Sequence, residues 1–154
     1  MKMTKEELAA KLEAHAKWLK TRYTGHVEGE RANLTCADLT DANLTDADLT
    51  DADLTDADLT CADLTGANLM DADLTRADLT RADLTGADLT RADLTDANLT
   101  DANITRADLT DANLTCANIE HVWSASTLVL DAISATFSAR MALKKTRVEW
   151  EHNR

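Results

Sequence analysis

Proline is absent from the 154-residue chain, and glycine occurs only four times. Aromatic residues make up 3%, too few for an ordinary globular core, which depends on large rings. No apolar run approaches the ~20 residues of a membrane-spanning helix, and the opening sequence MKMTKEELAA lacks the apolar stretch of a signal peptide. The three cysteines are an odd number, which is a poor basis for a disulfide framework. These absences favour a cytoplasmic protein that does not span a membrane.

Charge is distributed unevenly along the chain, whose net charge is −12. Residues 32–121 contain 19 Asp and Glu120 against four Arg, a net charge of −16, whereas each flank carries +2. Such a polyanion repels nucleic acid, so no direct binding to DNA or RNA is expected. It attracts basic proteins, including proteins that themselves bind DNA.

A period of five residues dominates the sequence. Alanine recurs at every fifth position from Ala32 to Ala117, which gives 18 units. Asp or Asn always follows the alanine, Leu or Ile comes third, and Thr comes fourth in all but two units. Only the fifth position varies freely, among Asp, Arg, Cys, Gly and His.

This period fits neither an α-helix nor a straight strand. Leucines five residues apart would circle a helix without forming a stripe, and would alternate between the two faces of a strand. The period does fit a chain that turns a corner every five residues, with Ala and Leu inside and the other three positions outside. Four corners close a coil of about 20 residues, and about 4.5 coils stacked at the usual strand spacing of about 4.8 Å extend roughly 22 Å.

The central aliphatic residues are expected to form the core of this stack, each layer resting on the next. They are Leu34, Leu39, Leu44, Leu49, Leu54, Leu59, Leu64, Leu69, Leu74, Leu79, Leu84, Leu89, Leu94, Leu99, Ile104, Leu109, Leu114 and Ile119. The Asp and Asn side chains beside each corner are expected to hydrogen-bond the backbone of the turn.

The tandem A(D/N)LTx units resemble the pentapeptide-repeat proteins, whose consensus is A(D/N)LXX, over residues 32–121 without a gap. The resemblance implies an all-β solenoid, a right-handed quadrilateral β-helix, closed at both ends by capping helices. The array is more regular than most natural members, which mix Phe with Leu at the centre. Such regularity is typical of a consensus or synthetic design, or of a recently expanded array.

Three parts are expected: a capping helix in residues 1–26, the solenoid in 27–123, and a C-terminal helix and tail in 124–154. Thr4 and Glu7 form the pattern of a capping box at the start of the first helix. The apolar stripe of that helix, which is expected to cover the first coil, consists of Leu8, Leu12, His15 and Leu19.

The C-terminal helix has two interpretations that do not exclude each other. It caps the last coil, or it pairs with a second copy, as the resemblance to known dimers of the family implies. The residues expected at the cap or dimer contact are Trp123, Leu130, Ile133, Phe137 and Met141.

Catalytic and metal-binding motifs are missing from the sequence. Its four histidines are scattered, without an HExxH or CxxC motif, and there is no Gly-rich phosphate loop. We therefore expect no enzyme, no cofactor and no metal. Cys36, Cys61 and Cys116 occupy outward positions too far apart for a disulfide, and are expected to be free thiols.

The acidic surface allows two interpretations. The charge density of the rod is similar to that of duplex DNA, and the family resemblance implies that some such rods inhibit DNA gyrase by occupying its DNA groove. Alternatively, outward Asp residues simply keep the rod soluble. The candidate acidic binding face consists of Asp48, Asp51, Asp71, Asp88, Asp108 and Asp111. The sequence thus predicts a rigid, non-catalytic scaffold or interaction module, with a DNA-mimicking inhibitor of gyrase as the alternative.

Overall fold

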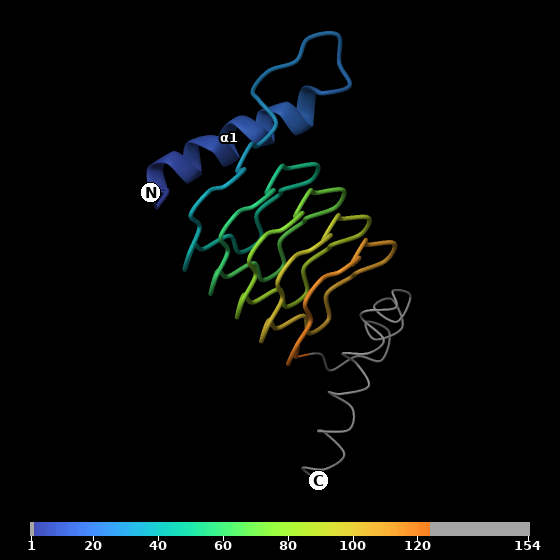
Figure 1. Ribbon diagram of the computed structural model, residues 1–154. Helices are drawn as coiled ribbons and strands as arrows, with labels where there is room; N and C mark the ends of the chain where they lie inside the picture. Colours follow the sequence, from blue (N-terminus) through green and yellow to red (C-terminus); the bar gives the residue numbers. More distant parts are fainter. Residues whose placement is uncertain (1, 124–154) are drawn as a thin grey trace, which may run out of the picture.

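The computed structural model describes residues 2–123, which form one helix and one stack of coils (Figure 1). The helix, α1 (Lys5–Thr21), lies across the N-terminal end of the stack. A loop of residues 22–31 projects beyond the helix and leads into the first coil, which begins at Ala32. The stack then continues to residue 123.

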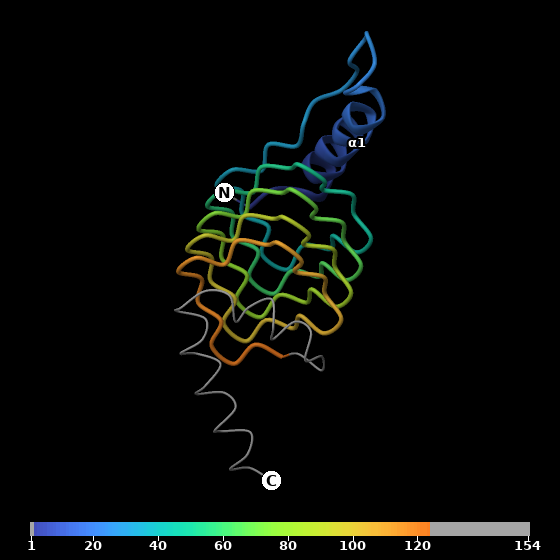
Figure 2. The same ribbon diagram turned by 90° about the vertical axis from the view of Figure 1, so that its right-hand side faces the viewer.

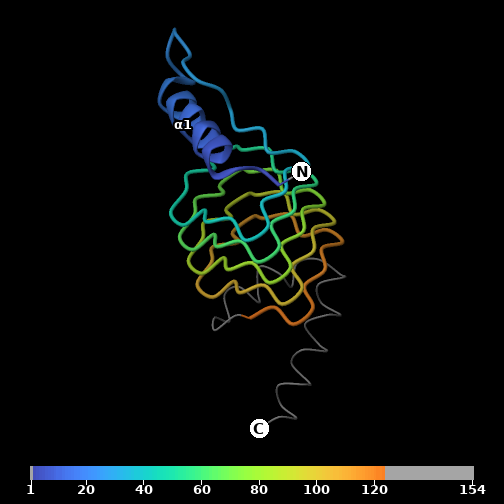
Figure 3. The ribbon, with the colours of Figure 1, turned by 90° about the vertical axis from the view of Figure 1, so that its left-hand side faces the viewer.

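Parallel β-bridges join each coil to the next. Asn33 pairs with Asp53, Asp53 pairs with Asp73, and the same 20-residue step recurs throughout the stack. Twenty residues make four pentapeptides, so each coil is four-sided, as the views in Figures 2 and 3 show. The bridges stay isolated because the chain turns at every repeat, and the described residues contain no longer strand. The 20-residue step of the bridges agrees with the predicted coil of four pentapeptides.

A tight turn forms each corner of a coil. The N–H of Ala77 donates to the carbonyl of Leu74, three residues earlier, over 3.0 Å, and equivalent bonds recur from repeat to repeat. The residue before this alanine has a positive φ at all 18 fifth positions, between 55° and 62° for the 16 that are not glycine. A turn of this kind favours glycine or asparagine at its third residue, because other side chains are strained in the left-handed region.

The core is a single column of aliphatic side chains. All 18 central Leu and Ile residues are at most 4% exposed. The alanines beside them are also buried in the middle coils, whereas Ala42 near one end and Ala112 near the other are only partly buried. Burying one leucine contributes on the order of 1.5–3 kcal/mol, so the column is the main source of stability.

The second position of each repeat stabilises the corner that follows it. The Oδ1 atom of Asp58 accepts a hydrogen bond from the backbone N–H of Thr60 over 3.0 Å, and Asn68 accepts one from Met70 in the same way. The predicted role of Asp and Asn in the turns is therefore confirmed.

At its start, α1 has the predicted capping box. The hydroxyl of Thr4 accepts from the N–H of Glu7 over 3.1 Å, and the Glu7 carboxylate accepts from the N–H of Thr4 over 2.8 Å. Leu8 and His15 are buried against the first coil, and Leu12 packs against the core.

The residues before α1 add one more parallel β-bridge at the N-terminal end of the stack, which the sequence pattern did not predict. Lys2 forms a parallel bridge with Asp38, and the N–H of Met3 donates to the Asp38 carbonyl over 3.0 Å. This segment therefore covers part of the exposed edge of the first coil, as α1 does beside it.

The last described residues continue the repeat register. Trp123 pairs with Asn103 at the position of an Asp or Asn, and its side chain is exposed. The other residues expected at the C-terminal contact, Leu130, Ile133, Phe137 and Met141, lie outside the described residues. Among residues 2–123 there is no helix with the length and hydropathy of a membrane span.

Candidate functional site

The 20-residue step places every fourth repeat on the same side of the solenoid. We number the four sides by their first alanine: side 1 begins at Ala32, side 2 at Ala37, side 3 at Ala42 and side 4 at Ala47. Each side presents outward rows of second-position, fourth-position and fifth-position residues. A row contains equivalent residues from successive coils, so charges of one sign in a row lie one strand spacing apart, about 4.8 Å.

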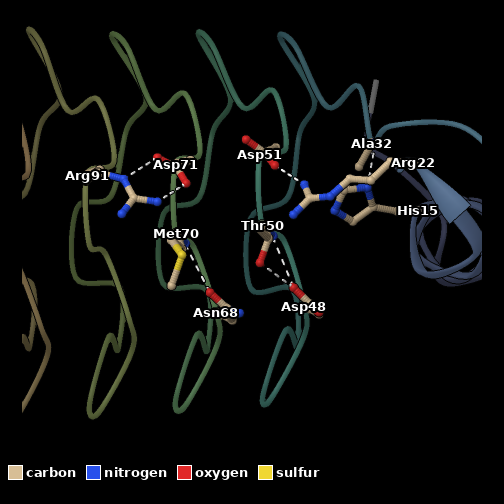
Figure 4. Close-up of polar contacts among 10 residues, drawn as sticks. All are labelled: His15, Arg22, Ala32, Asp48, Thr50, Asp51, Asn68, Met70, Asp71 and Arg91. Atoms are coloured by element: carbon tan, nitrogen blue, oxygen red, sulfur yellow. Dashed lines mark hydrogen bonds and ion pairs between the residues drawn. The ribbon is translucent and has the colours of Figure 1, made fainter. Parts of the chain in front are cut away.

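All six residues of the predicted acidic face lie on side 4. Asp48, Asp88 and Asp108 share the second-position row with Asn68. The fifth-position row of the same side contains Asp51, Asp71, Arg91 and Asp111, and Figure 4 shows how several of these residues follow one another from coil to coil.

Two arginines neutralise part of this face. Arg22, at the end of α1, forms an ion pair with Asp51 (Figure 4). Arg91 binds Asp71 with two hydrogen bonds, of 2.7 and 2.5 Å, and these bonds lower the pKa of Asp71. Side 4 is therefore not a continuous acidic surface, because two of its six carboxylates are paired.

A second group of carboxylates lies at the corner between sides 1 and 2. The second-position rows of these two sides contain Asp and no cation. The fifth-position row of side 1 lies between them and contains Asp56, Arg76 and Asp96. Arg76 pairs with Asp56 through two bonds of 2.7 Å. We call this group the acidic corner, and its carboxylates are Asp38, Asp53, Asp56, Asp58, Asp73, Asp78, Asp93 and Asp96.

Hydrogen bonds stabilise the charged form of two carboxylates of the acidic corner, Asp56 and Asp58. Hydrogen bonds donated by the hydroxyl and the N–H of Thr60 hold the pKa of Asp58 below its ordinary value of 3.8. Hydrogen bonds from Arg76 lower the pKa of Asp56. The sequence contained the signal for this corner, since applying the 20-residue step to sides 1 and 2 brings these residues together. Our sequence prediction instead selected side 4.

Asparagine amides end the acidic rows on the C-terminal side. Asn98 follows Asp78 in its row and donates its side-chain N–H to the Asp78 carboxylate over 3.3 Å. Asn113 does the same to Asp93 over 3.2 Å. The acidic corner is thus bounded by neutral hydrogen-bond donors.

Residues that could support metal binding or redox chemistry are dispersed. Within residues 2–123 no group of three or more His, Cys, Asp or Glu side chains is placed to hold a metal ion. Cys36 and Cys116 share the fifth-position row of side 1, and Cys61 lies on side 2. All three are free thiols.

Solved structures similar to this chain are pentapeptide repeat proteins. One, from the Arabidopsis thaliana thylakoid lumen, is 36% identical over 60% of this chain and 65% of its own, with a TM-score of 0.58. Another, Rfr23 from the cyanobacterium Cyanothece 51142, is 35% identical over 66% of this chain and 65% of its own, with a TM-score of 0.40. This chain therefore spans less than two thirds of the length of both.

A third, from Nostoc PCC 7120, is 32% identical over 71% of this chain and 93% of its own, with a TM-score of 0.32. The comparison with curated proteins gives no match. The family model for pentapeptide repeats matches eight copies, over residues 32–69, 67–105 and 92–123. These residues are the coils described above, and the chain belongs to the pentapeptide-repeat family, whose members fold as right-handed quadrilateral β-helices.

Proposed function

We propose that this protein is a rigid, non-catalytic interaction module that binds a basic surface of another protein through the acidic corner. The observation that supports this most directly is the uninterrupted row of Asp53, Asp73 and Asp93 beside the row of Asp58 and Asp78. Eight carboxylates, against Arg76 in the fifth-position row and Lys2 and Arg31 near the first coil, give this corner a negative potential. Such a potential attracts a basic partner and orients it during encounter.

The rigidity of the frame supports the same proposal. Each of these second-position carboxylates lies on a backbone bridged to the next coil, and the Oδ1 of Asp78 also accepts from Thr80 over 2.9 Å. Side chains held in this way lose little conformational entropy on binding. The corner therefore presents its charges in a preorganised array.

Calorimetric titration with an oligolysine peptide of eight residues tests the proposal at low salt and at 0.15 M salt. The variant D53N/D73N/D93N removes three charges from the acidic corner. The control variant D48N/D88N/D108N removes three charges at the same repeat position on side 4. We expect the corner variant to weaken binding on the order of tenfold, because exposed charge pairs contribute about 0.2–1 kcal/mol each, and the control to weaken it less. Equal losses in both variants would show that only total charge matters.

The alternative function is DNA mimicry, in which the protein would inhibit DNA gyrase by occupying its DNA groove. The charge density of the solenoid favours it. A net charge of −16 over a length of roughly 22 Å is about one charge per 1.4 Å, and duplex DNA carries about one charge per 1.7 Å. The ion pairs of Arg22 and Arg91 on side 4 weigh against it, because they interrupt the row of charges on that side.

A supercoiling assay with purified gyrase separates the two functions. Inhibition at low micromolar protein, weakened in D48N/D88N/D108N, would support mimicry through side 4. Absence of inhibition at tens of micromolar would exclude mimicry and leave the interaction module. Both triple variants should fold, because an Asn at the second position keeps the Oδ1 acceptor that Asn68 and Asn98 use.

A further inference from the structure

His15 connects α1 to the first residue of the solenoid. Its side chain is fully buried between the helix and the first coil. Its Nδ1 atom accepts a hydrogen bond from the backbone N–H of Ala32 over 3.0 Å, as Figure 4 shows. One face of the imidazole stacks on Trp18, with ring centroids 5.6 Å apart.

This geometry requires the neutral form of His15. An imidazole nitrogen that accepts a hydrogen bond carries no proton, so the ring hydrogen of neutral His15 is on Nε2. That atom is also buried and makes no hydrogen bond of good geometry, although the nearby backbone of Thr50 favours the protonated ring. Protonation at Nδ1 would place two N–H groups against each other and would bury a positive charge, both of which are unfavourable.

The charged groups around the imidazole have opposite effects on the pKa of His15. Arg22, at the C-terminal end of α1, disfavours a second positive charge, while Asp48 and Asp51 of the first coil favour it. Burial is the largest effect, and it lowers the pKa of His15 below its ordinary value of 6.5. The contribution of His15 to docking is therefore complete above pH 6.5, and it is lost as the pH falls from 6.5 toward the lowered value.

The contacts that hold α1 are few compared with those within the stack. Leu8 and His15 are the only buried residues of the helix. Leu12 packs against the core, Lys11 donates one bond to the Asn33 carbonyl, and Arg22 pairs with Asp51. The coils, in contrast, are joined by bridges along their whole length. Since each coil contacts only its neighbours, α1 can open locally while the remaining stack stays folded.

We propose that His15 is a pH-sensitive latch, whose protonation releases α1 from the first coil and uncovers the N-terminal β-edge of the solenoid. Release frees the carbonyls of Asn33 and Asp38, which Lys11 and Met3 occupy in the closed state. Unpaired backbone groups of this kind are able to pair with another extended chain. The latch therefore shifts the N-terminal edge from its closed state at neutral pH toward its open state in mild acid.

Hydrogen exchange on the full-length protein tests the latch at pH 7.5, 6.5 and 5.5, all above the sequence pI of 4.6. After correction for intrinsic exchange, protection of the α1 amides should fall roughly five- to tenfold between pH 7.5 and 5.5. Protection of central amides such as that of Leu79 should not change. The control variant His15→Asn offers a side-chain oxygen to the Ala32 N–H but does not titrate, so its α1 protection should be independent of pH.

Unchanged protection in the wild type, or the same decrease in His15→Asn, would overturn the latch. If α1 of the variant is already unprotected at pH 7.5, the imidazole of the wild type is titrated by nitrogen NMR instead. The latch requires an unprotonated Nδ1 and a pKa below 6.5. A protonated Nδ1 at neutral pH, or a pKa at or above that value, would overturn it.

Discussion

The side-chain amide of Asn98 donates to Asp78, its predecessor by one coil, over 3.3 Å and to the hydroxyl of Thr80 over 2.9 Å. Its own Oδ1 still accepts from the N–H of Thr100 over 3.2 Å, so the amide serves the corner of its own repeat as well. An asparagine one coil after an aspartate in the same row thus replaces a repulsion between two carboxylates with an attraction between neighbouring coils.

Changing Asp73 to Asn should therefore stabilise the protein. Asp73 lies between Asp53 and Asp93 in the acidic row of side 1, and an amide there would donate to the Asp53 carboxylate. We expect the free energy of unfolding to rise by about 0.5–1 kcal/mol at low salt, the usual net contribution of one hydrogen bond. The gain should shrink in 0.5 M salt, because salt screens the repulsion that the substitution removes. Urea denaturation at both salt concentrations measures it.

The reverse substitution, Asn98→Asp, is the matched control. It removes the donor to Asp78 and adds a charge in the same kind of row, so it should destabilise by a similar amount. A free energy of unfolding that does not rise in Asp73→Asn and does not fall in Asn98→Asp would show that the inter-coil amide bond contributes nothing.

Backbone conformation at the fifth position leads to a second prediction. Gly86 has a φ of 68°, and a Cβ built on it would meet no atom within 4 Å. Gly86→Ala should therefore cost about 1 kcal/mol through left-handed strain alone. Arg81 has a φ of 59°, so Arg81→Gly should recover part of the same strain. Chemical denaturation of both variants measures these changes. An unchanged unfolding midpoint for Gly86→Ala would contradict the prediction.

The leucine column leads to a third prediction. Leu79 is fully buried in the middle of the stack, and Leu79→Ala would leave a cavity between the coils before and after it. We expect a loss on the order of 2–5 kcal/mol in the free energy of unfolding, because the close-packed layers cannot collapse into the space. Thr75→Ala, on the outside of the same coil, should change stability by much less. A midpoint for Leu79→Ala equal to that of the wild type would contradict the stacked core.

The coil and its core were predictable from the sequence because the repeat has no competing interpretation. A period of five residues excludes a helix and a straight strand, and only a chain that turns at each repeat buries every leucine. The inward position of Leu79 and the turn-stabilising role of Asp58 follow directly from the place of each residue in its repeat.

The ends and the acidic surface were less predictable, because they depend on contacts between segments with no common period. Nothing in the repeat indicates that Met3 pairs with Asp38, or that His15 accepts a hydrogen bond from Ala32. The neutralisation of Asp51 likewise depends on where the end of α1 places Arg22. Local patterns determine the body of the solenoid, whereas tertiary docking determines its N-terminal edge.

The last prediction concerns the acid titration of the second-position carboxylates. The hydroxyl of Thr110 donates to Asp108 over 2.6 Å and its N–H donates over 2.9 Å, and these bonds lower the pKa of Asp108 below 3.8. The stability that they contribute is therefore present above pH 3.8 and is lost as the pH falls through the lowered value. Thr110→Val keeps the shape of the side chain but removes the hydroxyl donor, so the pKa of Asp108 should rise toward 3.8. Thr110→Ser keeps the donor and should leave the pKa low. Carbon NMR of the Asp108 carboxyl measures both variants, and an unchanged pKa in Thr110→Val would show that the backbone N–H alone causes the shift.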